Sequence, residues 1–276
     1  MATFVTAQWA EQHIDAPNLL FLDPRRPMRY LQGHLKHAVN LPVYKAFDAD
    51  AKLLPDAHLQ RWIGAAGLDD QATPVIYDSF DGQNGAMLVW LLEYFGRTNV
   101  HLLNIFFERW VAEGHEVFYK PVPAVSKTFI ARVNPQMRVT IDDLRRDSGL
   151  KLIDFRSREE YTGEQDRDGQ PGHIPGAVNI VWRDLVGPQQ EVLASCENIQ
   201  QLVGTTGIQR DDRIVAYCRL GMRAALGYLA LQQAGYDVRL YDRSYAEWAR
   251  RGLPSVCGSA RYGNGGAQPS PGASGT

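Results

Sequence analysis

The residues with the clearest chemical potential lie in one short stretch, IVAYCRLGMRAALGY, which spans residues 214 to 228. An apolar run ends there at Cys218, and Arg219, Gly221 and Arg223 follow at once. A helical pattern begins near Arg223, so loop N–H groups and the positive end of a helix dipole would face one point. Such an arrangement favours the binding of an anion. The stretch therefore predicts a cysteine thiolate, nucleophilic at neutral pH, beside a binding site for an anionic substrate.

The loop after the cysteine supplies the other candidate binding residues. Gly221 lets the backbone curl where a Cβ would obstruct it, and the two arginines add positive charge. If Cys218 attacks a sulfur atom, it becomes a persulfide whose outer sulfur lies among the loop amides. We assign catalysis to Cys218. We assign substrate binding to the five residues that follow it, which are Arg219, Leu220, Gly221, Met222 and Arg223. Cys196 and Cys257 lack such neighbours and are interpreted as small buried apolar side chains.

The elements that must position this loop follow from the apolar pattern. Short runs rich in Val, Ile, Leu and Tyr alternate with helical patterns, and they include LLFLD, PVIYD, KLID and IVAYC. Fully apolar strands separated by helices are typical of a mostly parallel sheet flanked by helices on both faces, so the predicted fold class is α/β. Ligands of such sheets bind at the carboxyl ends of the strands, which is where Cys218 is expected.

The two halves of the chain carry the same landmarks in the same order. LLFLDPRRPMRY parallels LKLIDFRSREEY, GHLKHAVNLP parallels GHIPGAVNIV, PVIYDSF parallels RIVAYCR, and NIFFERW parallels DRSYAEW. Their nearly constant spacing indicates a duplication. The second half has an extra polar stretch within TGEQDRDGQPG, which predicts a surface loop. Asp78 stands in the first half where Cys218 stands in the second, and a carboxylate cannot form a persulfide, so we expect the first half to be non-catalytic.

Polar and aromatic landmarks that both halves retain are predicted to be structural, because one half alone has a nucleophile. The Asp-x-Arg motifs would hold strand ends by charged hydrogen bonds, the histidines would be satisfied within the structure, and the tryptophans would pack in the core. These residues are Asp23, Arg25, His34 and Trp110 in the first half and Asp154, Arg156, His173 and Trp248 in the second.

Local composition sets the predicted domain boundaries. Residues 1–120 form the first domain, and residues 121–136, a proline-containing stretch with no helical period, form a linker. Residues 137–257 form the catalytic domain. Residues 258–276 are dominated by Gly, Ser, Ala and Pro, which predicts a disordered tail.

Charge and cysteine content exclude several classes of protein. Lys and Arg total 29 against 31 Asp and Glu, and this net charge of −2 predicts neither nucleic acid nor an anionic membrane as a partner. No apolar run is long enough to span a bilayer, and the opening residues lack a secretion signal. Three cysteines without close pairing or metal-ligand spacing predict a cytoplasmic protein that needs no metal or organic cofactor.

Taken together, LIDFRSREEY, GHIPGAVNIVW, YCRLGMRAA and the late Trp248 resemble the tandem-domain rhodaneses, sulfurtransferases built from two rhodanese-like α/β domains. The resemblance covers both halves. It implies a catalytic second domain with Cys218 as the sulfur acceptor, an active-site loop from Cys218 to Arg223, and a first domain that has lost its nucleophile. The chain differs from the best-known thiosulfate loop, where lysine stands at Leu220 and threonine at Arg223. Glu160 stands where many members carry a substrate-binding arginine.

The resemblance also implies the reaction. Basic residues after the cysteine favour thiosulfate, a dianion, and Arg219 and Arg223 fit that preference. The expected activity is transfer of a sulfane sulfur from thiosulfate to cyanide or a thiol through a persulfide on Cys218. One alternative is a 3-mercaptopyruvate sulfurtransferase, and another is a persulfide carrier or regulatory module that serves a protein partner. The expected partners are therefore a small-molecule sulfur donor, a thiophilic acceptor and, in the carrier alternative, a protein.

A phosphatase or arsenate-reducing enzyme of the same fold is the remaining rival. Those enzymes place arginine six residues after the cysteine in a longer loop that surrounds a tetrahedral phosphate. Here the arginine falls one position earlier, at Arg223, and Ala224 follows it. A shorter loop suits a sulfur atom better than a phosphoryl group.

Overall fold

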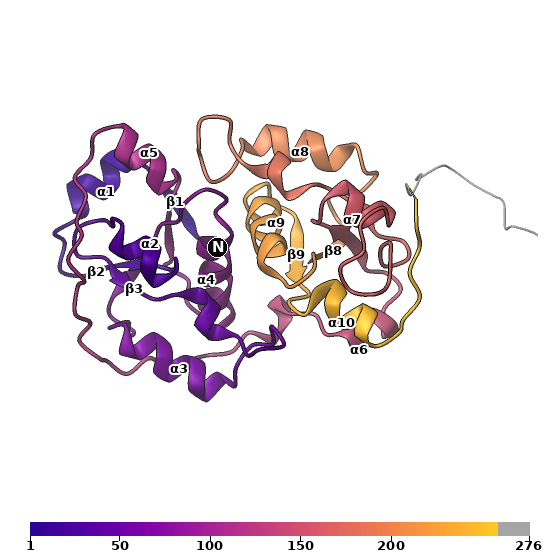
Figure 1. The fold of residues 1–276 in the computed structure, drawn as a ribbon, viewed down its shortest axis with the longest axis horizontal. Coiled ribbons are helices and arrows are strands. Elements are labelled where there is room, and N and C mark those ends of the chain that lie inside the picture. The colour runs from indigo at the N-terminus through magenta and orange to yellow at the C-terminus, as the bar shows by residue number, and fades with distance from the viewer. Residues whose placement is uncertain (259–276) are drawn as a thin grey trace, which may run out of the picture.

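The computed structural model describes residues 1–258 and has two lobes, each built on a parallel β-sheet with helices packed against it (Figure 1). The first half of the chain forms the lobe coloured indigo to magenta, and the second half forms the lobe coloured from pink through orange to yellow. The predicted disordered tail, residues 258–276, lies outside the described residues apart from Gly258. No helix within residues 1–258 combines the length and the apolar character needed to span a bilayer.

The first lobe contains a five-stranded sheet with the order β1-β5-β4-β2-β3, in which every pairing is parallel. Its strands are β1 (Thr3–Val5), β2 (Leu19–Asp23), β3 (Val39–Asn40), β4 (Thr73–Ile76) and β5 (His101–Leu103). Its helices are α1 (Ala7–His13), α2 (Pro27–Leu31), α3 (Asp56–Ala65), α4 (Gln83–Tyr94), α5 (Phe107–Ala112) and the 3-10 helix η1 (Val43–Ala46).

The second lobe repeats this plan in a four-stranded parallel sheet with the order β7-β6-β8-β9. Its strands are β6 (Lys151–Asp154), β7 (Val178–Asn179), β8 (Arg213–Tyr217) and β9 (Asp237–Leu240). Its helices are α6 (Ile141–Arg146), α7 (Arg158–Thr162), α8 (Cys196–Gly204), α9 (Met222–Gln233), α10 (Ser244–Arg250) and the 3-10 helices η2 (Pro135–Met137) and η3 (Trp182–Leu185). The shared strand order fits the predicted duplication.

Both faces of each sheet are buried, as the α/β prediction requires. In β4, Ile76 joins a central core that contains α4, whereas Val75 joins an outer core with Trp110 of α5. In β8, Ala216 joins the central core, and Val215 joins an outer core with Trp248 of α10. Successive strand residues point to opposite faces, so apolar side chains at every position need cover on both sides. The predicted fold class is confirmed.

The two lobes meet where α4 packs beside α9 (Figure 1). Residues 85–94 of α4 and 224–231 of α9 are all buried, and both helices contribute to one central core that is continuous between the lobes. A helix that is apolar on every side needs cover on every side, and here the sheet and the neighbouring lobe provide it.

The segment between the lobes lies against the first lobe. Residues 121–134 contain no helix or strand, as expected of a connecting segment. The backbone N–H of Lys127 donates to the carbonyl of Gly64, that of Arg132 donates to the carbonyl of Phe95, and the side chain of Phe129 is buried. These contacts hold the connection in place.

Candidate active site

Cys218 lies at the carboxyl end of β8, in the loop that leads into α9. Its side chain is 1% exposed, and its Sγ accepts a hydrogen bond of 3.2 Å from the N–H of Gly221. Its own N–H donates to Ser244 Oγ at 3.1 Å, and its carbonyl accepts from the N–H of Tyr245 at 3.0 Å. These contacts fix the sulfur beside the first turn of α9, where backbone N–H groups have no partner inside the helix.

The loop can take this shape because residue 221 is glycine. Gly221 precedes α9 with a φ of +88°, and a Cβ built on it would lie 2.5 Å from the carbonyl oxygen of Asp242. Asp242 is itself held by Arg138 through two hydrogen bonds of 2.8 and 2.9 Å. The backbone conformation and the close approach of Asp242 therefore both require a residue without a side chain.

Ser244 supports the loop and was missed by the sequence analysis. Its Oγ accepts from the N–H of Cys218 and donates to the carbonyl of Tyr241 at 2.8 Å. Its backbone has a φ of +55°, a strained value for a residue with a side chain. Ser244 is the first residue of α10, which follows β9, and β9 is the neighbour of β8 in the sheet. The predicted parallel sheet was therefore the signal that could have drawn attention to Ser244.

Arg223 forms a charged pair with Glu160. Its Nη1 and Nη2 atoms donate to the two carboxylate oxygens at 2.6 and 3.0 Å. Burial by itself would raise the pKa of Glu160, but the hydrogen bonds and charge of Arg223 outweigh it and hold that pKa at about 2. Glu160 also caps α7 by accepting from the N–H of Ser157. The positive charge of Arg223 is therefore balanced inside the protein.

Arg219 is paired in the same way, with Asp168. Its Nη2 lies 2.8 Å from Asp168 Oδ1, its Nε donates to Oδ2 at 3.1 Å, and Nη2 also donates to the carbonyl of Arg167. Asp168 belongs to the extra polar stretch of the second half, residues 162–172. We expected this stretch to be a surface loop, and the structure shows that it also contacts the active-site loop.

A cavity of about 570 Å³ opens beside Cys218. Four of the five residues predicted to bind substrate line it, namely Arg219, Leu220, Met222 and Arg223, whereas Gly221 contributes its N–H to the sulfur. Gln83, the first residue of α4, also lines it, so the first lobe forms part of its wall. The remaining lining residues are Ser157, Glu159, Glu160, Gln165, Arg167, Trp182 and Arg183. Arg167 and Arg183 are additional cations that the sequence analysis missed, because they lie far from Cys218 in the chain.

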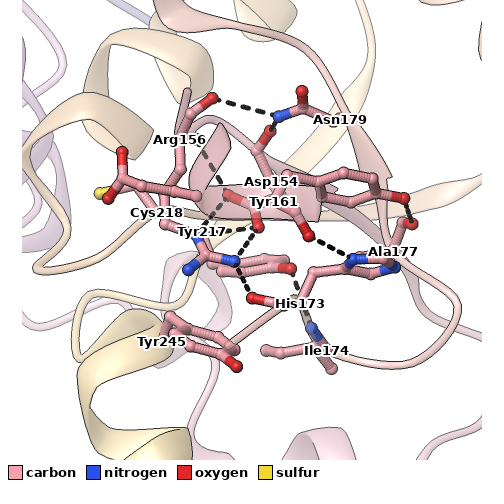
Figure 2. Close-up of polar contacts among 12 residues, drawn as sticks. Asp154, Arg156, Tyr161, His173, Ile174, Ala177, Asn179, Tyr217, Cys218 and Tyr245 are labelled. Atoms are coloured by element: carbon pink, nitrogen blue, oxygen red, sulfur yellow. Dashed lines mark hydrogen bonds and ion pairs between the residues drawn. The ribbon is translucent and has the colours of Figure 1, made fainter. Parts of the chain in front are cut away.

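The Asp-x-Arg motif lies behind the active-site loop and is buried (Figure 2). Arg156 donates to Asp154 at 2.7 to 3.0 Å and to the carbonyl of Gly172 at 2.8 Å, and its guanidinium stacks on Tyr245 at 3.9 Å. In the first lobe, Arg25 donates to Asp23 and to the carbonyl of Gly33 in the same manner. Recurrence in the lobe without a cysteine supports a structural role.

The other shared landmarks are also held within the structure. His173 donates from Nδ1 to the carbonyl of Tyr161 at 2.8 Å and stacks on the Tyr161 ring, and burial lowers the pKa of His173 (Figure 2). His34 stacks on Tyr30 in the first lobe. The indole N–H groups of the two tryptophans donate to backbone carbonyls at 3.0 and 2.8 Å, and both rings are buried; these residues are Trp110 and Trp248.

Asp78 lies in the first lobe where Cys218 lies in the second, just after β4 and before α4. Its carboxylate is fully buried, accepts from the N–H of Ser79 at 2.8 Å and accepts from the N–H of Gly85 at 2.7 Å. Burial raises the pKa of Asp78 to about 7, although these two N–H groups act in the opposite direction. In the first lobe, therefore, a carboxyl group lies at the N-terminus of α4. In the second lobe, the thiol of Cys218 lies at the equivalent end of α9.

The interpretation of Cys196 and Cys257 as buried side chains is wrong. Both are exposed. Cys196 is the first residue of α8, where the helix surface faces solvent, and Cys257 follows α10 near the end of the described chain.

The fold and the site define an α/β protein with a cysteine at a strand end, next to a helix N-terminus, in the second of two equivalent lobes. The family model for the rhodanese-like domain matches residues 6–113 and 139–251. The chain belongs to this family, and the predicted resemblance is confirmed.

Three relatives match most of the chain. The putative thiosulfate sulfurtransferase of Haloferax volcanii is 29% identical over 266 residues, which cover 88% of this chain and 92% of the relative. The thiosulfate sulfurtransferase of Corynebacterium glutamicum is also 29% identical over 266 residues, with 88% and 86% covered. The sulfur carrier protein TtuD of Thermus thermophilus is 26% identical over 275 residues, with 92% and 96% covered.

Among solved structures, the fold is similar to that of the anaerobic ergothioneine biosynthesis enzyme from Chlorobium limicola in complex with trimethyl histidine. The TM-score is 0.85, the sequence identity is 20%, and the match covers 93% of this chain and 70% of that protein. At this identity the likeness concerns the fold.

Proposed function

We propose that this protein is a sulfurtransferase in which Cys218 takes a sulfane sulfur from thiosulfate and passes it to cyanide or a thiol. The observation that carries the proposal is the hydrogen bond of 3.2 Å from Gly221 N–H to the Cys218 sulfur, beside the first turn of α9. This geometry favours a negatively charged sulfur, first as thiolate and then as persulfide. The names of the relatives from Haloferax and Corynebacterium support the same donor.

The reaction is a double displacement. The Cys218 thiolate attacks the outer sulfur of thiosulfate, a bond forms between Sγ and that sulfur, and sulfite leaves with the electron pair of the broken S–S bond. Cyanide or a thiolate then attacks the outer sulfur of the persulfide, and the electron pair of that S–S bond returns to Sγ. Charge balances in both steps, and the covalent intermediate predicts ping-pong kinetics.

In this proposal the five loop residues after Cys218 form the donor site. Arg219 and Arg223 orient the donor with the N–H groups that do not bind their carboxylate partners. Leu220 and Met222 form an apolar part of the cavity wall. Gly221 supplies the N–H that holds the sulfur. The first lobe is non-catalytic because Asp78 replaces the nucleophile. A reducing compartment such as the cytoplasm would keep Cys218 available as a thiol.

The donor is tested by comparing kcat/KM for thiosulfate and 3-mercaptopyruvate on one preparation, with cyanide as the acceptor. We expect saturation with both substrates, a higher kcat/KM for thiosulfate, and no turnover by Cys218→Ala. A higher kcat/KM for 3-mercaptopyruvate would show that this compound is the donor, and Cys218 would remain the proposed nucleophile. Turnover that survives in Cys218→Ala would contradict the whole proposal.

A persulfide carrier that serves a protein acceptor is the second candidate, and the similarity to the sulfur carrier protein TtuD favours it. The two candidates share the first half-reaction and differ in the second. A carrier would load Cys218 from thiosulfate but discharge it slowly to cyanide and small thiols. Rapid discharge to small acceptors would favour the enzyme.

A further inference from the structure

Positive charge next to the sulfur is balanced within the site. Arg219 pairs with Asp168 and Arg223 pairs with Glu160, and the side chains of the two acids are only 10% and 4% exposed. Solvent therefore screens the charges of these two acids only weakly. The loop that carries Cys218 consequently offers a substrate hydrogen bonds but little net charge. A second site for an anionic group would therefore need a cation elsewhere in the cavity.

Arg183 provides such a cation, on another part of the cavity wall. It lies on η3, its guanidinium stacks on the ring of Trp182 at 4.9 Å, and both residues line the cavity. None of the ion pairs formed among residues 1–258 includes Arg183. Burial raises the pKa of Asp81 in the first lobe, and the charge of Arg183 is among the effects that oppose this rise. Arg183 also shares the cavity wall with Gln83, which belongs to the first lobe.

The wall around Arg183 is suited to an organic anion. Gln83, at the start of α4, adds an amide whose Nε2 donates to Asp81 Oδ2 at 3.0 Å and keeps a second N–H and the amide oxygen for a ligand. Trp182 adds an aromatic ring. The cavity of about 570 Å³ is far larger than an ion as small as thiosulfate requires, and falls in the size range that encloses organic ligands. Guanidinium groups bind carboxylates through paired hydrogen bonds.

We propose that Arg183, Gln83 and Trp182 form a carboxylate subsite, and that the sulfur acceptor is an organic thiol that bears a carboxylate. The carboxylate binds Arg183, the carbon chain lies against Trp182, and the thiolate reaches the outer sulfur of the Cys218 persulfide. A bond forms between the thiolate sulfur of the acceptor and the outer sulfur of the persulfide, the bond from that sulfur to Sγ breaks, and its electron pair returns to Sγ. This inference rests on the proposed function and names its acceptor class.

The first test compares two thiols that differ in the carboxylate. Enzyme loaded from thiosulfate is discharged with 3-mercaptopropionate or with 2-mercaptoethanol in single-turnover experiments. We expect Arg183→Gln to raise the half-saturating concentration of 3-mercaptopropionate about tenfold, as for the loss of one charge-assisted interaction, and to leave 2-mercaptoethanol unchanged. Arg145→Gln, which removes an exposed arginine outside the cavity, should change neither. Equal effects of Arg183→Gln on both thiols would overturn the proposal.

The second test needs no sulfur transfer. The thioether 3-(methylthio)propionate should protect Cys218 from alkylation by iodoacetamide, and Arg183→Gln should weaken this protection about tenfold. Equal protection in both proteins would overturn the subsite. Failure of the proposed function would look different, because wild-type protein would then release no sulfite from thiosulfate while protection still depended on Arg183. If Arg183→Gln impairs loading from 3-mercaptopyruvate but not discharge, the subsite serves a donor and the acceptor assignment is wrong.

Discussion

The position of the reactive sulfur depends on single residues, and Gly221 is the first of them. Its N–H contacts the sulfur, its φ of +88° lies where glycine is favoured, and Asp242 leaves no room for a Cβ. Cys218, Ser244 and Gly221 therefore form one small rigid unit. In such a unit, a displacement of about 1 Å can cost about a hundredfold in rate.

We predict that Gly221→Ala lowers kcat/KM for sulfur transfer about a hundredfold, because the added Cβ must displace the loop or Asp242. Gly114→Ala is the matched control, since Gly114 has a φ of +81° and no atom within 4 Å of its Cβ position. Both variants place an alanine at a positive φ, but Gly221→Ala alone also creates a steric clash, with Asp242. Steady-state kinetics measure the difference, and equal activities of the two variants would contradict this account of the loop.

Asp168 offers a second test at the scale of one residue. Replacing it with asparagine frees the charge of Arg219 for the substrate. We predict that Asp168→Asn lowers KM for thiosulfate several-fold and lowers KM for 3-mercaptopyruvate less, because the dianion gains more from an added positive charge. Asp211→Asn, an exposed change of the same type, controls for net charge. An unchanged KM for thiosulfate in Asp168→Asn would show that Arg219 does not face the donor.

At the scale of elements, the strands, the helices and the repeat could be predicted because each has a local pattern. Apolar runs such as residues 214–217 need cover on both faces, and Cys218 comes where such a run ends. Contacts made by irregular segments have no such pattern. Asp168 meets Arg219 from a loop without periodicity, and Ser244 meets Cys218 from the first residue of α10, after a neighbouring strand. The sequence therefore placed Cys218 and its loop at the end of a buried strand, but it did not predict the acids that pair with the two arginines of the loop.

The loop of the first lobe shows what a carboxylate does in this element. Folding buries Asp78 and raises its pKa from 3.8 to about 7, so between these values the folded protein binds more protons than the unfolded chain. Stability must then fall as pH rises through this range. We predict that Asp78→Asn does not show this fall in stability. The melting temperature of the variant should therefore rise relative to that of the wild type between about pH 4 and pH 7. Thermal unfolding of both proteins across this range measures it, and a constant difference would contradict the burial of a shifted carboxyl.

At the scale of the whole molecule, the two lobes act together. The helices α4 and α9 share one core, and Glu93 of α4 accepts a hydrogen bond of 3.2 Å from the hydroxyl of Tyr228 in α9. Gln83, from the same helix, lines the cavity beside Cys218. The first lobe therefore supports this cavity and forms part of its wall.

We predict that the two lobes unfold in one transition and that Leu226→Ala lowers the stability of both by about 2–5 kcal/mol. Leu226 is fully buried in α9, and its Cδ1 lies 3.5 Å from the Cβ position of Gly82 in the first lobe. Hydrogen exchange under denaturant, followed separately for amides of β4 and β8, measures the response. Destabilisation confined to β8 would show that the lobes are independent.

The central claim is that Cys218 carries the transferred sulfur, and the mass of the peptide that contains it tests this most directly. After brief treatment with thiosulfate and no acceptor, we predict one added sulfur atom on Cys218, none on Cys196 or Cys257, and one sulfite released for each protein molecule. Addition of cyanide should remove the added sulfur. Thiosulfate turnover with no added sulfur on Cys218, or undiminished turnover in Cys218→Ser, would contradict the account.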